Sequence, residues 1–335
     1  MMQIAIVALE GSLLSAISGL ADMFWICNQA SRNPPPGVAT GLAGGPSPLF
    51  HTRIVSADGQ PLRDPQGRLI PVDAAFDAET NYDAILIAGM ALGPDGQPPH
   101  TEAQAQAARW LSSRHQAGVL IGGACAGTFV LGEAGLLDRR RCTTTWWLHH
   151  VFKQRFPAAC HVWGSAMEEQ DGIITTGGPL SWVDLALHVI RQLAGPALAK
   201  LAADISVADS LPLPQLLYAP RGFVNTANPL LLQAEQIIRH AHPGMTAEAL
   251  AQALHLSERT LHRRLKQLTG ESPKAFITRV RIETACVLLG TPGISIKQVA
   301  GQCGYVDETA FRRAFIQAMS LTPVDYRRRM QSHQP

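Results

Sequence analysis

The chain has 335 residues, which is more than one small hydrophobic core requires and is a natural length for two domains. Hydrophobic residues make up 46% of it and charged residues 16%, so the composition excludes a largely disordered chain. The net charge of +2 is unevenly spread, because residues 228–335 contain 14 lysines and arginines but 8 acidic residues. This basic C-terminal third predicts a polyanionic partner for that part of the chain alone.

The sequence shows no sign of a membrane partner, a leader or a metal site. No apolar run reaches the roughly 18 residues of a membrane span, and residues 1–9 read as a first strand, not as a signal peptide. The six cysteines form no CxxC pair and suit neither zinc nor a disulfide framework. We therefore expect mostly buried free thiols, a cytoplasmic location, and neither a metal nor another cofactor.

Residues 1–205 alternate apolar strands with helices. The predicted strands are residues 3–9, 53–57, 83–88, 118–122 and 173–176. The predicted helices are residues 12–30, 101–117, 126–134 and 181–193, with Thr101 as an N-cap. This alternation predicts an α/β domain with a mostly parallel, flavodoxin-like sheet that is covered on both faces.

A linker is predicted over residues 206–227, where Pro212, Pro214, Pro220 and Gly222 interrupt any periodicity. From residue 228 to residue 335 the pattern is helical throughout. The chain is therefore expected to join an α/β domain, residues 1–205, to an all-α domain, residues 228–335.

The all-α region contains a repeat, with an offset of 49 residues before a turn and 50 after it. Each copy reads as a short helix, a tight turn and a second helix. The predicted N-caps are Thr246 and Ser295 for the first helices and Ser257 and Asp307 for the second. Gly304 supplies the turn of the second copy, and His255 occupies that place in the first. These are two helix-turn-helix units.

A longer helix, residues 273–290, is predicted between the two units, with Ser272 as its N-cap and Gly290 as its stop. Its length of about 25 Å suits two second helices placed about one DNA turn, roughly 34 Å, apart. The buried stripes of the second helices are predicted to be Leu261, Leu265 and Leu268, and Phe311, Phe315 and Met319.

These motifs resemble the AraC/XylS family over about residues 228–329, in LAQALHLSERTLHRRLKQLTGESPKAFI and SIKQVAGQCGYVDETAFRRAFIQAMSLTPVDYRRR. The resemblance implies a sequence-specific transcription regulator whose second helices enter successive major grooves of double-stranded promoter or operator DNA. Arginine and histidine can donate to guanine or phosphate, and glutamate can accept from cytosine. Carried over by position, the DNA contacts are Arg259, His262, Arg263, Glu308, Thr309, Arg312 and Arg313, with Thr260 and Lys266 for the DNA backbone.

In the α/β region, the segment GGACAGT at residues 122–128 follows a buried strand and opens a helix. Small residues around Cys125 indicate a nucleophile elbow, and the helix N-terminus is expected to lower the thiol pKa. With Gly89-Met90 and the segment 143–146, this region resembles the PfpI-like branch of the class I glutamine amidotransferase superfamily over residues 3–195. It looks most like the GlxA-type regulators, which fuse such a domain to AraC-type helices.

Enzymes of that superfamily pair the elbow cysteine with a histidine and a carboxylate. Here the histidine position holds Thr145, and the acidic position falls at about Ala16. Acyl transfer needs a proton shuttle, so we predict that the domain is not an enzyme and that its old active site senses a small metabolite. The expected ligand-pocket residues are Cys125, Ala126, Gly89, Met90, Thr145 and Glu10.

Two other interpretations stay open. In the first, the protein is an active cysteine hydrolase or amidotransferase that also binds DNA, and His149, His150 or His161 lies within hydrogen-bond reach of Cys125. In the second, the domain serves only for dimerisation and Cys125 is a packed core thiol. The resemblance also implies a homodimer formed through this domain, and it suggests small nitrogenous or amino-acid-derived effectors.

Overall fold

The computed structural model describes residues 1–34, 48–76, 80–94, 96–209, 212, 215, 218, 228–240, 245–291, 293–319 and 321–332. The chain divides into two compact units, Met1–Gln215 and Leu216–Pro335. This division falls within the predicted linker, residues 206–227. Most of the linker lies outside the described residues, Pro214, Pro220 and Gly222 included.

The first unit is built on a seven-stranded sheet of order β10-β11-β7-β6-β1-β2-β5. Every neighbouring pair is parallel except β10 with β11. The strands of this sheet are β1 (Met2–Val7), β2 (Phe50–Ser56), β5 (Ala74–Ala75), β6 (Ala84–Ile87), β7 (Leu120–Ala124), β10 (Met167–Gln170) and β11 (Ile173–Thr176). Two smaller sheets pair β3 (Leu62–Arg63) with β4 (Leu69–Ile70) and β8 (Arg141–Cys142) with β9 (Cys160–His161).

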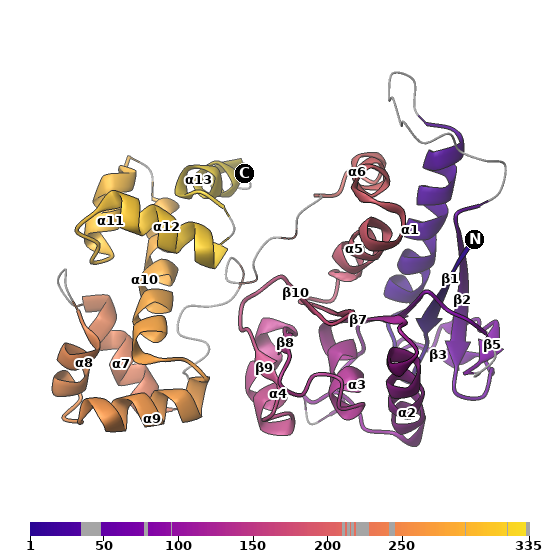
Figure 1. Ribbon diagram of the computed structural model, residues 1–335, viewed down its shortest axis with the longest axis horizontal. Coiled ribbons are helices and arrows are strands. Elements are labelled where there is room, and N and C mark those ends of the chain that lie inside the picture. The colour runs from indigo at the N-terminus through magenta and orange to yellow at the C-terminus, as the bar shows by residue number, and fades with distance from the viewer. Residues whose placement is uncertain are drawn as a thin grey trace. The chain divides into compact units, whose positions relative to one another are not determined.

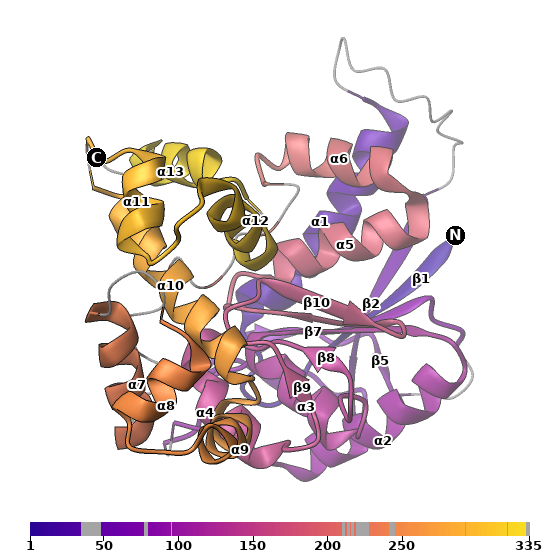
Figure 2. The ribbon, with the colours of Figure 1, turned by 60° about the vertical axis from the view of Figure 1, so that its left-hand side comes forward.

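Alternation along the strands divides the core of this unit into two layers. On β1, Ile4 and Ile6 pack under α1 (Leu14–Arg32), α5 (Trp182–Ala194) and α6 (Pro196–Ile205). Ala5 and Val7 pack on the opposite face, with α2 (Glu102–Gln116), α3 (Thr128–Glu133) and α4 (His149–Arg155). The two sets of helices cover the two faces of the sheet, as Figures 1 and 2 show.

The sequence predicted this layered α/β fold, and the predicted capping of α2 is confirmed. Thr101 Oγ1 accepts from the Gln104 amide, and the Gln104 side chain accepts in return from the Thr101 amide. The helices α4 and α6 were missed, and so were the short strands β3, β4, β5, β8, β9 and β10. The predicted helices of this unit end at residue 193, whereas Pro196, at the first helical position, starts α6.

The second unit is a set of helices arranged around α10 (Figure 1). The helices are α7 (Pro229–His240), α8 (Ala247–Ala253), α9 (Glu258–Thr269), α10 (Pro273–Leu289), α11 (Ile296–Gln302), α12 (Glu308–Met319) and α13 (Pro323–Ser332). Phe276 and Val280 of α10 pack into a core with α7, α8 and α9. Ile282 and Leu289 pack into a second core with α11, α12 and α13. One helix thus belongs to both helix-turn-helix units, α8–α9 and α11–α12.

Local signals in this unit were read correctly, with one exception. The side chains of Thr246, Ser257, Ser272, Ser295 and Asp307 all accept backbone N–H bonds at the helix starts for which they were predicted. The buried stripe of α9 was wrong at one position. Leu268 is 36% exposed, and Thr269 is buried in its place, with its hydroxyl donating to the Leu265 carbonyl at 2.8 Å.

Candidate DNA interface and effector site

The exposed face of α9 carries the predicted DNA contacts of the first helix-turn-helix unit, α8–α9. Arg259, His262 and Arg263 are exposed, and they make no hydrogen bond or ion pair with any described residue. With Lys266 and Gln267 they line one shallow hollow. Gln267 was missed by the sequence analysis, although it stands one helical turn after Arg263. The structure therefore brings donors together on a face that is free to take a partner.

The second helix-turn-helix unit presents a different surface. Thr309 and Arg313 are exposed on α12. Arg312 and Glu308, in contrast, are joined in an ion pair whose Nη2–Oε1 distance is 2.7 Å. At the start of the helix, hydrogen bonds from the backbone N–H groups of Thr309 and Ala310 lower the pKa of the Asp307 carboxyl.

Two further predicted DNA contacts already have partners within their own helix. The Thr260 hydroxyl lies 2.9 Å from the Ser257 hydroxyl at the N-cap of α9. Lys266 Nζ donates to the Gly270 carbonyl, at a distance of 2.9 Å, at the other end of the helix. A phosphate would have to share these groups with the helix ends that they cap.

In the α/β unit, Met1–Gln215, the predicted pocket residues follow the carboxyl ends of adjacent strands. The register pairs Val7 of β1 with Ile87 of β6, and Ile87 with Gly123 of β7. Glu10, Gly89-Met90 and Cys125 come just after these positions. The strand order reverses between β1 and β6, and the crevice beside such a reversal is where open α/β sheets bind ligands.

The elbow at Cys125 is a strained turn. Cys125 has a φ of +54°, and its carbonyl accepts hydrogen bonds of 2.7 Å from the hydroxyls of Thr128 and Thr144. A Cβ at Gly127 would lie 2.6 Å from the Ala88 carbonyl oxygen, which explains the small residue there. At Gly89, a Cβ would meet the Cβ of Cys125 at 3.4 Å. Ala126, Gly89 and Met90 are all buried beside the elbow.

The expectation of a lowered thiol pKa is wrong. Cys125 is 4% exposed, and burial raises the pKa of its thiol to about 12. The Ala126 amide and the Thr145 hydroxyl hydrogen-bond to the sulfur and lower the pKa, but by less than burial raises it. The helix start is therefore present, but the thiol is neutral at physiological pH.

Thr145 occupies the place in which an enzyme would hold its base. Its side chain is fully buried, and apart from the sulfur it has no partner among the described residues. No histidine is among the described groups that shift the pKa of Cys125. His149 and His161 pair with each other instead, their Nδ1 atoms 2.9 Å apart, and burial lowers the pKa of His161 to about 3. Ala16 belongs to α1, and its side chain is buried in the core.

Glu10 differs from the other predicted pocket residues. It is exposed in the turn after β1, and its side chain makes no hydrogen bond or ion pair with any described residue. The structure places it at the same end of the sheet as the elbow, with its side chain exposed.

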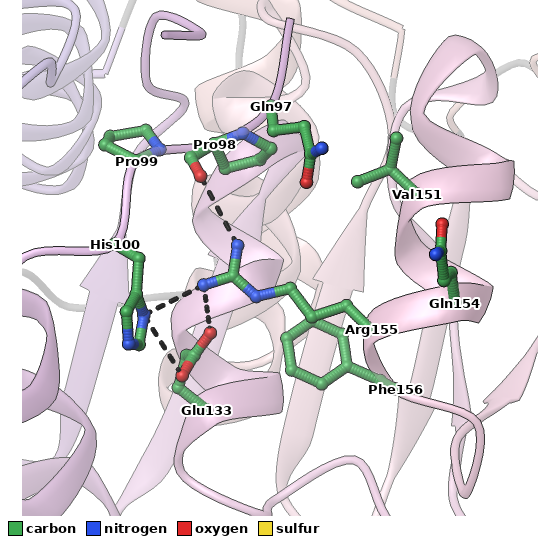
Figure 3. Close-up of a pocket in the computed structure, with 9 residues that line it drawn as sticks. All are labelled: Gln97, Pro98, Pro99, His100, Glu133, Val151, Gln154, Arg155 and Phe156. Atoms are coloured by element: carbon green, nitrogen blue, oxygen red, sulfur yellow. Dashed lines mark hydrogen bonds and ion pairs between the residues drawn. The ribbon is translucent and has the colours of Figure 1, made fainter. Parts of the chain in front are cut away.

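A hollow of about 600 Å³ in the α/β unit lies between the loop before α2, the end of α3 and α4. Figure 3 shows Arg155 at its centre, where its guanidinium forms an ion pair with Glu133 and lies 3.0 Å from His100 Nδ1. Arg155 also donates to the Pro98 carbonyl at 3.3 Å. Its charge is therefore matched within the wall, and none of the predicted pocket residues lines this hollow.

Comparisons with known proteins agree with this architecture. The model of the DJ-1/PfpI family matches residues 49–192, and that of a helix-turn-helix domain matches residues 250–329. The transcriptional regulator CdhR of Pseudomonas aeruginosa is 28% identical over 280 residues, which are 82% of this chain and 81% of that protein. The regulator GlxA of Rhizobium meliloti is 26% identical over 314 residues, which are 92% and 94% of the two chains.

A crystal structure from Vibrio parahaemolyticus resembles the chain with a TM-score of 0.50 at 16% identity, over 61% of this chain and 98% of that one. That likeness supports the fold of the α/β unit alone. Two helix-turn-helix units on a shared helix, joined to an α/β domain with an elbow, define a DNA-binding transcription regulator. More particularly, the chain belongs to the AraC-type transcriptional regulators that carry a DJ-1/PfpI domain, and GlxA is among its relatives.

Among the described residues, no helix combines the length and the apolar character that crossing a bilayer requires. Nor does this part of the chain gather three or more histidine, cysteine or acidic side chains around a common point that could hold a metal ion. The cysteines Cys27, Cys125, Cys142, Cys286 and Cys303 are buried and free, and Cys160 is free and exposed.

Proposed function

We propose that residues 228–335 bind promoter or operator DNA and that residues 1–205 sense a small-molecule effector that changes this binding. The exposed cationic face of α9 carries the first part of the proposal, because three of its donors have no partner among the described residues. The proposed DNA contacts are Arg259, Thr260, His262, Arg263, Lys266, Glu308, Thr309, Arg312 and Arg313. Because the partner is DNA, the proposed location is the cytoplasm.

The effector is proposed to bind at the elbow, beside Cys125, Ala126, Gly89, Met90 and Thr145, with Glu10 at the rim. The Thr145 hydroxyl is buried and faces the thiol, so a carbonyl or anionic ligand would find a donor there together with the backbone amides of the elbow. The domain is also proposed to form the homodimer contact. Effector and DNA would then be coupled by about 1–3 kcal/mol, and reciprocally.

We propose further that this site does not catalyse a reaction. A neutral thiol whose neighbour is a threonine lacks both an activated nucleophile and a proton shuttle. The competing function is a working cysteine hydrolase or amidotransferase, and the strained elbow is the feature that favours it.

Turnover and melting assays on the full-length chain separate these functions. We expect no hydrolysis of glutamine or of small amides above the rate of a Cys125→Ser variant. In a thermal-shift screen of metabolites, an effector should stabilise the wild type and the exposed-site control Cys160→Ser more than Cys125→Ser. Multiple turnover that disappears in Cys125→Ser would establish the enzyme. A metabolite that shifts all three proteins equally would place the sensing site elsewhere.

A further inference from the structure

A groove of about 740 Å³ runs between the two helix-turn-helix units. Its walls are the entrance to α8, one side of α10, Tyr305 and the exposed side of α12. Three of the lining residues are cations and none is acidic. The polar lining residues of the helices and of the entrance to α8 are Thr246, Lys274, Thr278, Arg281, Arg313 and Gln317.

Arg281 of α10 holds two walls of the groove together. Its Nη2 donates to the Met245 carbonyl, at 3.2 Å, at the entrance to α8. Its guanidinium also lies 5.6 Å from the centre of the Tyr305 ring, in the turn of the second helix-turn-helix unit, α11–α12. The groove therefore owes its shape to a residue that contacts both helix-turn-helix units.

The other two cations are available to a ligand. Lys274 and Arg313 are exposed, and neither makes a hydrogen bond or ion pair with a described residue. Arg313 and Gln317 belong to the face of α12 that the proposed function places against DNA. The groove therefore opens beside a recognition helix and offers positive charge without an acidic residue in its lining; Asp307, outside the lining, interacts electrostatically with Arg313.

We infer that this groove holds the sugar–phosphate backbone of the DNA segment that separates the two major grooves; the inference rests on the proposed function. Two recognition helices about one turn apart on one face of a duplex straddle that backbone. Lys274 supplies the phosphate contact and Thr278 lies beside it on α10. Contacts of this kind set the register of the protein on DNA without reading its sequence.

The inference is tested with the full-length chain on two probes, a random-sequence duplex and a duplex that the chain selects from a random pool. Lys274→Gln should weaken binding to both probes by the same factor, and its slope of log K against log salt should be shallower by about 0.9. The advantage of the wild type should therefore shrink roughly threefold between 50 and 200 mM salt. Lys274→Arg should restore binding, and Arg328→Gln, an equal charge change on α13, should have no effect.

A second variant, Thr278→Glu, puts a carboxylate into the groove and should weaken binding to both probes more than Lys274→Gln does. The inference is overturned if Lys274→Gln binds both probes as the wild type does, or if it loses affinity only for the selected duplex. If the wild type binds neither duplex, the proposed function itself fails.

Discussion

His255 and Gly304 hold the same left-handed backbone conformation at equivalent points of the two helix-turn-helix units, with φ of +55° and +81°. The chain reaches each of them through the same hydrogen bond to a carbonyl three residues earlier. The His255 amide bonds to the Gln252 carbonyl, and the Gly304 amide bonds to the Gly301 carbonyl, both at 3.0 Å. The two turns differ in their surroundings, because Gly304 is packed beneath the guanidinium of Arg281.

Gly304→Ala should therefore destabilise the helical unit, Leu216–Pro335, by about 1–2 kcal/mol. The new Cβ would be strained by the positive φ and would lie 3.1 Å from Arg281 Nη2. Gly301→Ala is the matched control, since its Cβ meets nothing within 4 Å on α11, and it should stabilise by up to about 1 kcal/mol. Urea denaturation of the full-length chain, in which the unfolding of this helical unit is followed, measures the change in the free energy of unfolding for both variants. Equal effects of the two variants would contradict the argument.

Arg279→Leu should destabilise the same unit by about 3–5 kcal/mol. Arg279 is 12% exposed and forms ion pairs with Glu271, Glu283 and Glu235 at 3.1, 2.6 and 3.6 Å. Its removal leaves the buried carboxylates of Glu235 and Glu283 with Arg239 as their remaining shared cation among the described residues. Arg328→Ala breaks a pair that is 77% and 45% exposed and should change stability by less than about 0.5 kcal/mol. Denaturant midpoints compare the two, and a loss below about 1 kcal/mol for Arg279→Leu would refute the buried-network account.

The first unit should lose stability in mild acid through His161. Burial lowers the pKa of this imidazole from 6.5 to about 3, so the unfolded chain takes up a proton before the folded chain does. The free energy of unfolding should fall by up to about 1.4 kcal/mol per pH unit as the pH drops from about 6.5 towards 3. His161→Phe keeps a ring against Phe152 and should make this profile flatter. A variant with the wild-type slope between pH 6 and pH 4 would assign the titration to another group.

Arg263→Ala and Arg313→Ala should each weaken binding to a selected duplex by roughly 1–3 kcal/mol if the two arginines reach bases. Both side chains are exposed and neither makes a hydrogen bond or ion pair with a described residue, so neither substitution should disturb the fold. Fluorescence anisotropy on selected and random duplexes measures the loss, with Arg328→Ala as the control. Equal losses on the two duplexes would assign the arginines to phosphates, and no loss on either would remove them from the interface.

Features that depend on neighbouring residues were predictable from the sequence. The caps at Ser257 and Asp307 and the turns at His255 and Gly304 follow from short-range chemistry, and the repeat of 49–50 residues made them visible twice. Features that depend on how deeply a turn is packed by distant segments were not predictable. The raised pKa of Cys125 reflects how deeply the elbow is packed, and no local pattern reports that. The hydrogen bond from Arg281 to the Met245 carbonyl likewise connects residues that are 36 positions apart in the sequence.

The central claim is that both helix-turn-helix units of one chain read DNA together. Hydroxyl-radical footprinting of the full-length protein on a duplex that it selects from a random pool tests this claim most directly. The account predicts two protected patches on one face of the duplex, with centres about 10 base pairs apart, and it predicts that Arg263→Ala and Arg313→Ala each weaken a different patch. A single protected patch, or protection that both variants reduce alike at both positions, would contradict it.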